Sequence, residues 1–270
     1  MKHKMKHKTL PSLLSFVAIT GPLHASTLLL SDNFDDNPNN NSWSFNNNLA
    51  STQAGTLATT SYSVQGWNWT AQHSNGNRLL VATSSDGNGN GSVSLDNNFA
   101  TQANAADEAL QISFNLHEVG GYGDTTRWVQ FNVGNTPNLD VGNPTVGAGV
   151  IFRVNGEAGA LSGGSGIGTP VTWTADDLIT ITLSGTGGVG SAFNGNGSEA
   201  TISIGAINYG TFALAQQTNA YLTFSAFNYG NDQFGLGTFD NLSVTLVPEP
   251  GTALLGGLGM LALLRRRRPH

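Results

Sequence analysis

The chain has 270 residues, no cysteine, 10% charged residues and a formal net charge of −6. Its lysines all lie within residues 1–8 and four arginines lie at 265–268, so residues 26–247 keep only Arg78, Arg127 and Arg153 against all but one of the 17 acidic residues. Without clustered cations the middle of the chain is a poor partner for nucleic acid. Without cysteine it forms neither disulfides nor thiolate metal sites.

Residues 1–25 have the pattern of a secretory signal peptide. Met1–Lys8 contains four lysines, Leu10–Gly21 is mostly apolar, and the small residue Ala25 precedes the predicted cut. A positive region, an apolar region and a small-residue cleavage site in that order predict export through the secretion translocon. The mature chain is expected to begin near Ser26.

Residues 26–247 are predicted to form one all-β domain. Gly, Asn, Ser and Thr are abundant, and in Ala109–His117 every second residue is apolar, which places one face in a core and the other in water. About a dozen such strands, separated by Asn- and Gly-rich turns, predict a jelly-roll β-sandwich without a long helix before the tail. The residues predicted to face the core are Leu110, Ile112, Phe114, Leu116, Val129, Phe131, Val133, Val150, Phe152, Val154, Ile179, Ile181, Leu183, Ile202, Ile204, Leu222, Phe224, Leu242, Val244 and Leu246.

One loop has half of a calcium-binding pattern. Asp86, Asn88, Asn90 and Gly91 match the first half of D-x-[DN]-x-[DN]-G, in which alternate side-chain oxygens converge on the ion. The twelfth position is Asn97 rather than Glu. A plain Asn-Gly hairpin loop therefore remains the alternative.

A tryptophan on a polar strand face indicates glycan contact. Trp128 alternates with Gln130 and Asn132, and an indole ring suits the apolar side of a sugar. If neighbouring strands pack side by side, Asn115, His117 and Arg153 would share this face and could bind hydroxyls or an acidic sugar. Shielding of Trp128 by a loop or strand is the alternative. The other tryptophans are predicted to pack in the core or at its rim: Trp43, Trp67, Trp69 and Trp173.

The C-terminal tail carries an ordered set of signals. Val247 and Pro248-Glu249-Pro250 precede an apolar run, Gly251–Leu264, and the cluster Arg265, Arg266, Arg267 and Arg268. The run of about 14 residues would span roughly 21 Å as a helix, which is short against a hydrocarbon core of about 30 Å. Arginines after it favour the cytoplasmic side. The tail is therefore predicted to hold the protein at the membrane transiently, with everything before it outside.

This order resembles the PEP-CTERM sorting signal of Gram-negative bacteria, here at residues 248–270. The resemblance implies an exosortase-type membrane enzyme as partner, which cuts near Pro248-Glu249-Pro250 and delivers the protein to the cell surface or extracellular matrix. A simple C-terminal anchor helix is the alternative.

The two ends of the body resemble those of the concanavalin-A-like lectin and glucanase superfamily, in the segments Leu30–Asp35 and Gly237–Val244. The resemblance implies that the first and last strands lie together, with a structural ion held by Asp32, Asp35 and Asp240. It also implies, for the enzymes, the motif E-x-D-x-x-E, which is missing here.

These features favour a non-catalytic surface protein that contributes to or binds an exopolysaccharide or biofilm matrix, with no required cofactor and at most a structural calcium ion. Two alternatives stay open. A glycan-active hydrolase would need two carboxylates about 5 to 9.5 Å apart in a groove. A purely structural surface protein would bury Trp128 and have no ligand site.

Overall fold

The computed structural model describes residues 25–34, 53–66, 72–74, 78–83, 89–121, 128–137, 147–162, 165–195, 197–228 and 235–248. The chain divides into two units, residues 25–249 and residues 1–24 with 250–270. The signal-peptide cut at Ala25 stays a prediction. The apolar and arginine-rich parts of the tail lie outside the described residues. No helix among the described residues is long and apolar enough to cross a membrane.

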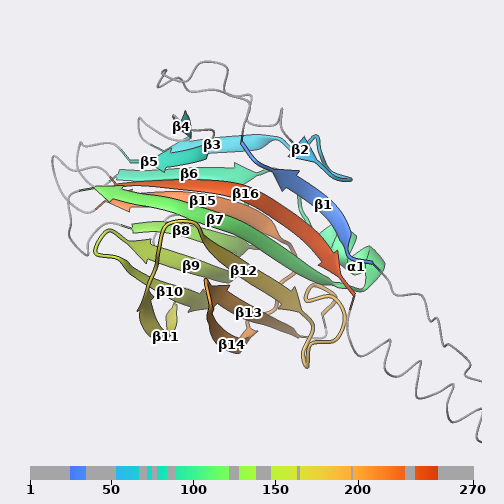
Figure 1. Ribbon diagram of the computed structural model, residues 1–270. Helices are drawn as coiled ribbons and strands as arrows, with labels where there is room; N and C mark the ends of the chain where they lie inside the picture. The colour runs from blue at the N-terminus through green and yellow to red at the C-terminus, as the bar shows by residue number, and fades with distance from the viewer. Residues whose placement is uncertain are drawn as a thin grey trace, which may run out of the picture. The chain divides into compact units, whose positions relative to one another are not determined.

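The described body consists of two antiparallel sheets, as predicted for a β-sandwich (Figure 1). In the nine-stranded sheet the order is β14-β13-β12-β7-β16-β1-β2, with β5 paired to β16 and β4 paired to β5. Its strands are β1 (Thr27–Asp32), β2 (Gln53–Ala54), β4 (Gln72–Ser74), β5 (Arg78–Ala82), β7 (Ala109–Gly121), β12 (Asp177–Ser184), β13 (Ser198–Ile204), β14 (Ile207–Leu214) and β16 (Gly235–Val247).

The seven-stranded sheet has the order β11-β10-β9-β8-β15-β6-β3. Its strands are β3 (Tyr62–Gly66), β6 (Gly89–Leu95), β8 (Trp128–Gly134), β9 (Gly147–Arg153), β10 (Glu157–Ser162), β11 (Ser165–Thr172) and β15 (Tyr221–Asn228). The inner faces of both sheets supply one core, so their outer faces point in opposite directions.

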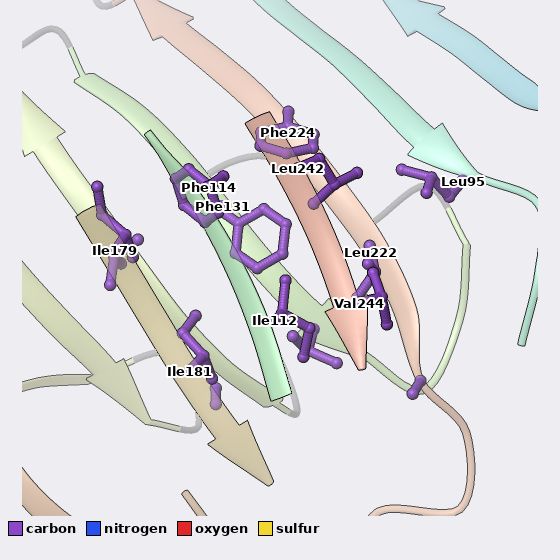
Figure 2. Packing of buried hydrophobic residues seen from close by; sticks show 14 of the residues in the cluster. Leu95, Ile112, Phe114, Phe131, Ile179, Ile181, Leu222, Phe224, Leu242 and Val244 are labelled. Carbon is purple, nitrogen blue, oxygen red and sulfur yellow. The ribbon is translucent and has the colours of Figure 1, made fainter. Parts of the chain in front are cut away.

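The core is built from the apolar residues that alternate along the strands (Figure 2). At its centre the Phe114 ring lies 4.6 Å from Phe131, 5.4 Å from Phe224 and 5.8 Å from Phe239, measured between ring centroids. All four side chains are fully buried. Each contributes roughly 1.5–3 kcal/mol through removal of apolar surface from water. The core positions predicted from alternation are confirmed except Val154, which lies half-buried in the turn after β9 because that strand ends at Arg153.

The first and last strands pair, as the superfamily resemblance implied. β1 runs antiparallel to β16, with Thr27 opposite Leu246 and Asp32 opposite Leu242. Figure 1 shows β16 between β1 and β7.

One short helix, α1 (Ala100–Ala106), was not predicted. It buries Ala100 and Ala103 and ends at Asp107, whose backbone is left-handed with φ 53° and whose N–H reaches the carbonyls of Ala103 and Asn104. Seven residues are too few for a recognisable apolar stripe, so its helicity depends on tertiary packing.

Candidate functional site

The six residues predicted to contact a glycan lie on two opposite surfaces. Trp128, Gln130 and Asn132 project from β8 on the outer face of the seven-stranded sheet, and Arg153 of β9 stands opposite Trp128. Asn115 and His117 project from β7 on the outer face of the nine-stranded sheet. The expectation that all six share one face is wrong, because β7 and β8 follow each other in the chain but belong to different sheets.

The side chains around Trp128 on this side of the sheet form a defined group, which we call the β8–β15 face. It consists of Trp128, Gln130 and Asn132 of β8, Thr223, Ser225 and Phe227 of β15, and Ser92 and Ser94 of β6. Residues opposite each other on paired strands share a face. The strand register places residues of neighbouring strands side by side in three rows. The first row contains Phe227, Trp128 and Arg153. The second contains Ser92, Ser225, Gln130 and Ile151, and the third contains Ser94, Thr223, Asn132 and Gly149.

The centre of the β8–β15 face is buried although it is polar. Gln130 is 1% exposed, Asn132 2% and Ser225 0%. Several of its polar atoms have no hydrogen-bond partner within the protein, namely Trp128 Nε1, Gln130 Nε2, Asn132 Nδ2, Asn132 Oδ1 and Ser225 Oγ. Buried polar groups are nearly always paired, and each unpaired one costs about 1–3 kcal/mol. This face therefore carries several buried donors and acceptors that lack hydrogen bonds.

Other groups of the β8–β15 face are satisfied within the protein. Ser94 and Thr223 satisfy each other, with their hydroxyl oxygens 2.9 Å apart. Asn132 Oδ1 occupies the space above Gly149, where a Cβ would overlap it. The glycine of β9 thus leaves room for the Asn132 amide beside the strand.

Trp128 forms one end of this face. Its ring stacks on Phe227, with centroids 4.2 Å apart and planes at 25°. The side chain is only partly exposed. Phe227 covers one side of the indole, so a sugar ring could stack only on the other side.

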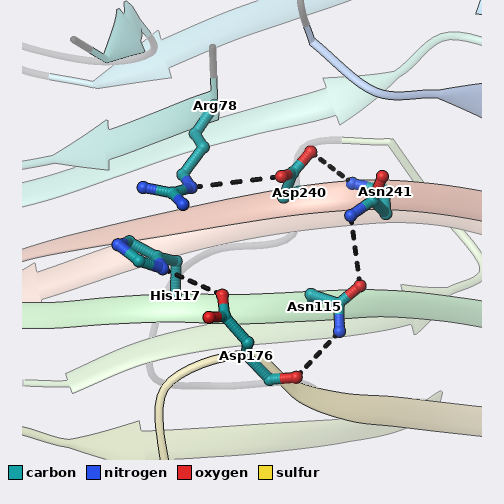
Figure 3. A network of polar contacts seen from close by, with 6 residues as sticks. All are labelled: Arg78, Asn115, His117, Asp176, Asp240 and Asn241. Atoms are coloured by element: carbon teal, nitrogen blue, oxygen red, sulfur yellow. Dashed lines mark hydrogen bonds and ion pairs between the residues drawn. The ribbon is translucent and has the colours of Figure 1, made fainter. Parts of the chain in front are cut away.

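The opposite outer face carries a polar network in which Asn115, His117, Asp176 and Asn241 contact one another (Figure 3). His117 Nδ1 lies 2.9 Å from Asp176 Oδ1, and Asn115 Nδ2 donates to the Asp176 carbonyl oxygen at 2.9 Å. Asn241 Nδ2 donates to Asn115 Oδ1 at 3.3 Å. The exposed His117–Asp176 pair therefore fastens the segment before β12 onto β7.

A second pair completes this network. Arg78 Nε lies 4.0 Å from Asp240 Oδ2, and the Asn241 N–H donates to Asp240 Oδ1 at 2.7 Å. Asp176 and Asn241 both have left-handed backbones, with φ of 66° and 52°. Asn241 marks a bulge in the pairing of β16 with β7.

The implied calcium site at the terminal strands does not form around Asp32 and Asp240. Asp32 stands opposite the core residue Leu242 and is 1% exposed, whereas Asp240 stands opposite Asn115 and faces outward. The bulge at Asn241 separates them onto different faces. Asp35 lies outside the described residues, and among those described no three His, Cys, Asp or Glu side chains gather to hold a metal ion.

The loop predicted to bind calcium is only partly described. Asp86 and Asn88 lie outside the described residues, and Asn90 stands in β6 opposite Phe227. The last part of the matched pattern, Asn90 and Gly91, therefore belongs to strand β6. Trp43, Trp67 and Trp69 also lie outside the described residues, whereas Trp173 packs against the core rim and donates its indole N–H to the Arg153 carbonyl, as predicted for rim packing.

Asp32 instead links the two sheets. Its carboxylate accepts hydrogen bonds from the Tyr62 hydroxyl at 2.7 Å and the Phe34 N–H at 2.9 Å. Burial, and then the adjacent Asp32 charge, raise the pKa of Tyr62 well above its ordinary value near 10. A neutral Tyr62 bridging β1 and β3 is therefore part of the fold.

The comparison with protein families decides the nature of the C-terminus. Residues 246–268 match the family model described as the PEP-CTERM protein-sorting motif. The chain carries a PEP-CTERM sorting motif. The match includes the Pro-Glu-Pro triplet and the arginine cluster. No curated protein sequence matches the chain.

Solved structures similar to this chain include sugar-binding domains. The metal-free Emp46p carbohydrate recognition domain is 11% identical, with 67% of this chain and 87% of that chain covered at a TM-score of 0.42. A legume lectin-like domain from Entamoeba histolytica is 12% identical, with 69% and 90% covered at 0.43. The binding domain of botulinum neurotoxin serotype D/C is 12% identical, with 83% and 49% covered at 0.46.

The glutamates of the described sandwich are dispersed. Glu118 lies on β7, Glu157 on β10 and Glu199 on β13, while Glu108 precedes β7. Glu199 is engaged by the Gly187 N–H at 3.1 Å, and Glu157 lies 4.0 Å from Arg153. None of the residues that define the β8–β15 face is acidic.

Five members of the β8–β15 face were missed from sequence, namely Ser92 and Ser94 of β6 and Thr223, Ser225 and Phe227 of β15. The alternation that predicted Leu222 and Phe224 in the core also predicted their neighbours on the opposite face. What was lacking was the pairing of β15 with β8, a contact between segments about 90 residues apart in the chain.

Proposed function

We propose that this protein is exported, sorted through its PEP-CTERM motif and bound to a glycan of the cell surface or matrix by its β8–β15 face. The observation that carries the proposal is the group of buried, unpaired hydrogen-bonding atoms on Gln130, Asn132 and Ser225. In this role the protein acts without catalysis, as a binding component of an exopolysaccharide or biofilm matrix.

A sugar can form the hydrogen bonds that these buried atoms lack. Its hydroxyls donate and accept, and therefore suit the mixed amide and hydroxyl atoms that lack partners. The Trp128 ring, stacked on Phe227, adds apolar surface beside them. Aromatic and polar groups placed together in this way favour a ring that is apolar on one side and hydroxylated at its edge.

The two ends of the chain supply the route to that glycan. The N-terminal pattern directs the chain to the translocon, and the tail presents Pro248-Glu249-Pro250 outside a Gram-negative inner membrane to an exosortase-type enzyme. Replacing these three residues with alanine is expected to trap the full-length protein in the membrane. Unaltered release of the variant would contradict the sorting proposal.

Binding is tested with the processed protein recovered from the surface or medium of its own host. Its affinity for the host's extracellular polysaccharide is measured by isothermal titration calorimetry, alongside Trp128→Ala and Gln130→Ala. Each variant is expected to weaken binding tenfold or more, because it removes a stacking surface or a buried donor. Gln111→Ala is the matched control, since Gln111 lies on the other sheet and bonds Thr182 there.

Two results would contradict the glycan-binding proposal. One is the absence of binding by the unaltered protein at any polysaccharide concentration. The other is an equal loss of affinity in Gln111→Ala and Gln130→Ala. Melting temperatures of all variants separate lost binding from lost folding.

The purely structural alternative is favoured by one observation, the depth of the face. Ser225 and Thr223 are fully buried, as they would be in a protein whose polar interior is filled by ordered water. The same titration decides between the two functions, because a water-filled interior binds no polysaccharide.

A further inference from the structure

We infer that the β8–β15 face selects an uncharged glycan and binds it without a metal ion. The inference rests on the proposed function and specifies its ligand. It follows from the charge of the face, from the kinds of atoms that lack partners and from the absence of carboxylates among the residues that define it.

The face is neutral on an acidic protein. Its eight residues carry no charge, although residues 26–247 hold 16 of the 17 acidic residues, all but Glu249, and only three arginines. The cation nearest in register is Arg153, which ends the row of Phe227 and Trp128. Arg153 is already engaged, with its Nε 4.0 Å from Glu157 Oε2. Among the described residues of these rows, no other cation is placed to bind an acidic sugar.

An anion would therefore be costly here. Moving an ionised carboxylate into a buried place without a cation costs several kcal/mol, and a sulfate has the same difficulty. The surrounding acidic body would repel it as well. A neutral sugar avoids both costs.

The unpaired atoms require a ligand that both donates and accepts. Trp128 Nε1, Gln130 Nε2 and Asn132 Nδ2 are donors, whereas Asn132 Oδ1 is an acceptor and Ser225 Oγ can be either. A carboxylate only accepts, so a carboxylate placed against Asn132 Oδ1 would leave that atom unpaired. A sugar hydroxyl can accept from one amide and donate to the other.

A bridging metal ion would find no carboxylate among the eight residues of this face. Calcium takes about six to eight oxygen ligands, usually with carboxylates among them, and these side chains supply only amide and hydroxyl oxygens. Elsewhere in the described sandwich no cluster suited to a metal ion forms. Binding should accordingly persist in a chelator.

The test separates the host's own polysaccharide by anion exchange into an unretained neutral fraction and a retained acidic fraction. The processed protein is titrated with each fraction, in 50 and 500 mM NaCl, with EDTA and with calcium. Matched commercial pairs, hydroxyethylcellulose with carboxymethylcellulose and methyl-esterified pectin with polygalacturonate, vary charge on one backbone.

The neutral fraction is expected to bind at least tenfold more tightly than the acidic one, with less than a twofold change on adding salt or EDTA. Arg153→Met should leave this affinity within twofold, while Ser225→Ala, which adds no charge, should weaken it about threefold to tenfold. Preference for the acidic fraction, lost in high salt and in Arg153→Met, would overturn the inference and leave glycan binding intact. So would abolition of binding by EDTA. Binding of neither fraction would instead overturn the proposed function, and with it the inference.

Discussion

The two outer faces of the sandwich have similar sequence patterns and opposite hydrogen-bond states. Gln111, Asn115 and His117 on β7 alternate with core residues just as Gln130 and Asn132 do on β8. These three side chains of β7 are partly exposed and bonded to neighbouring groups, whereas Gln130 and Asn132 of β8 are buried and have atoms that lack partners. A polar strand face thus becomes a candidate binding site when it is buried without internal partners, and polarity alone does not identify it.

The largest effect is expected at a buried polar pair that is satisfied, Asp32 with Tyr62. Tyr62→Phe removes the hydroxyl that donates to the buried carboxylate. Hydrogen bonds to charged groups contribute about 1.5–3 kcal/mol, so the free energy of unfolding should fall by that amount. Urea unfolding of the processed protein measures it. A loss below about 0.5 kcal/mol would mean that losing a buried hydrogen bond is not penalised here, and the contrast with the β8–β15 face would lose its basis.

The same pair makes stability depend on alkaline pH. Because the folded-state pKa of Tyr62 is raised, the folded protein keeps a proton that the unfolded chain releases near pH 10. Its contribution is fully present below about pH 10 and is lost as the pH rises from there towards the folded-state pKa. Unfolding measured from pH 8 to pH 11 should show this loss in the native protein. Tyr62→Phe should lack that component, and identical slopes for both proteins would contradict the assignment.

A buried polar group without partners should respond in the opposite direction. Asn132→Leu replaces two unpaired atoms by apolar atoms of similar shape, so the unfolding free energy without ligand should rise by about 1–3 kcal/mol while glycan binding is lost. Asn115→Leu is the matched control, because Asn115 is bonded to Asp176 and Asn241, and it should lose about 1 kcal/mol. Opposite signs would support the comparison of the two faces. Destabilisation by both substitutions would mean that the Asn132 amide is hydrogen-bonded in the folded protein.

Sequence alone predicted the core but not the site, for a physical reason. Alternation is a property of each strand by itself, so Leu110, Phe114 and Phe131 could be assigned to the core before any pairing was known. Which strands lie side by side depends on contacts between distant segments. β7 and β8 therefore looked like neighbours, and His117 was grouped with Trp128.

Irregular backbone geometry was equally invisible. Strict alternation would place Asp240 and Leu242 on one face, and hence Asp240 beside Asp32. The bulge at Asn241, with φ 52°, turns Asp240 outward instead. Bulges depend on the strand pairing around them, which explains why the metal site inferred from the superfamily resemblance does not assemble around these two residues.

The smallest effect is expected in the exposed network. His117→Ala removes the contact of Nδ1 with Asp176, whose side chain is 65% exposed. Exposed pairs contribute only about 0–1 kcal/mol, so the unfolding free energy should change by less than 1 kcal/mol and glycan affinity should stay within twofold. The measurement pairs urea unfolding with the polysaccharide titration used for Gln130→Ala. A tenfold loss of affinity in His117→Ala, with folding intact, would move the binding site to the nine-stranded sheet and reverse the assignment of the two faces.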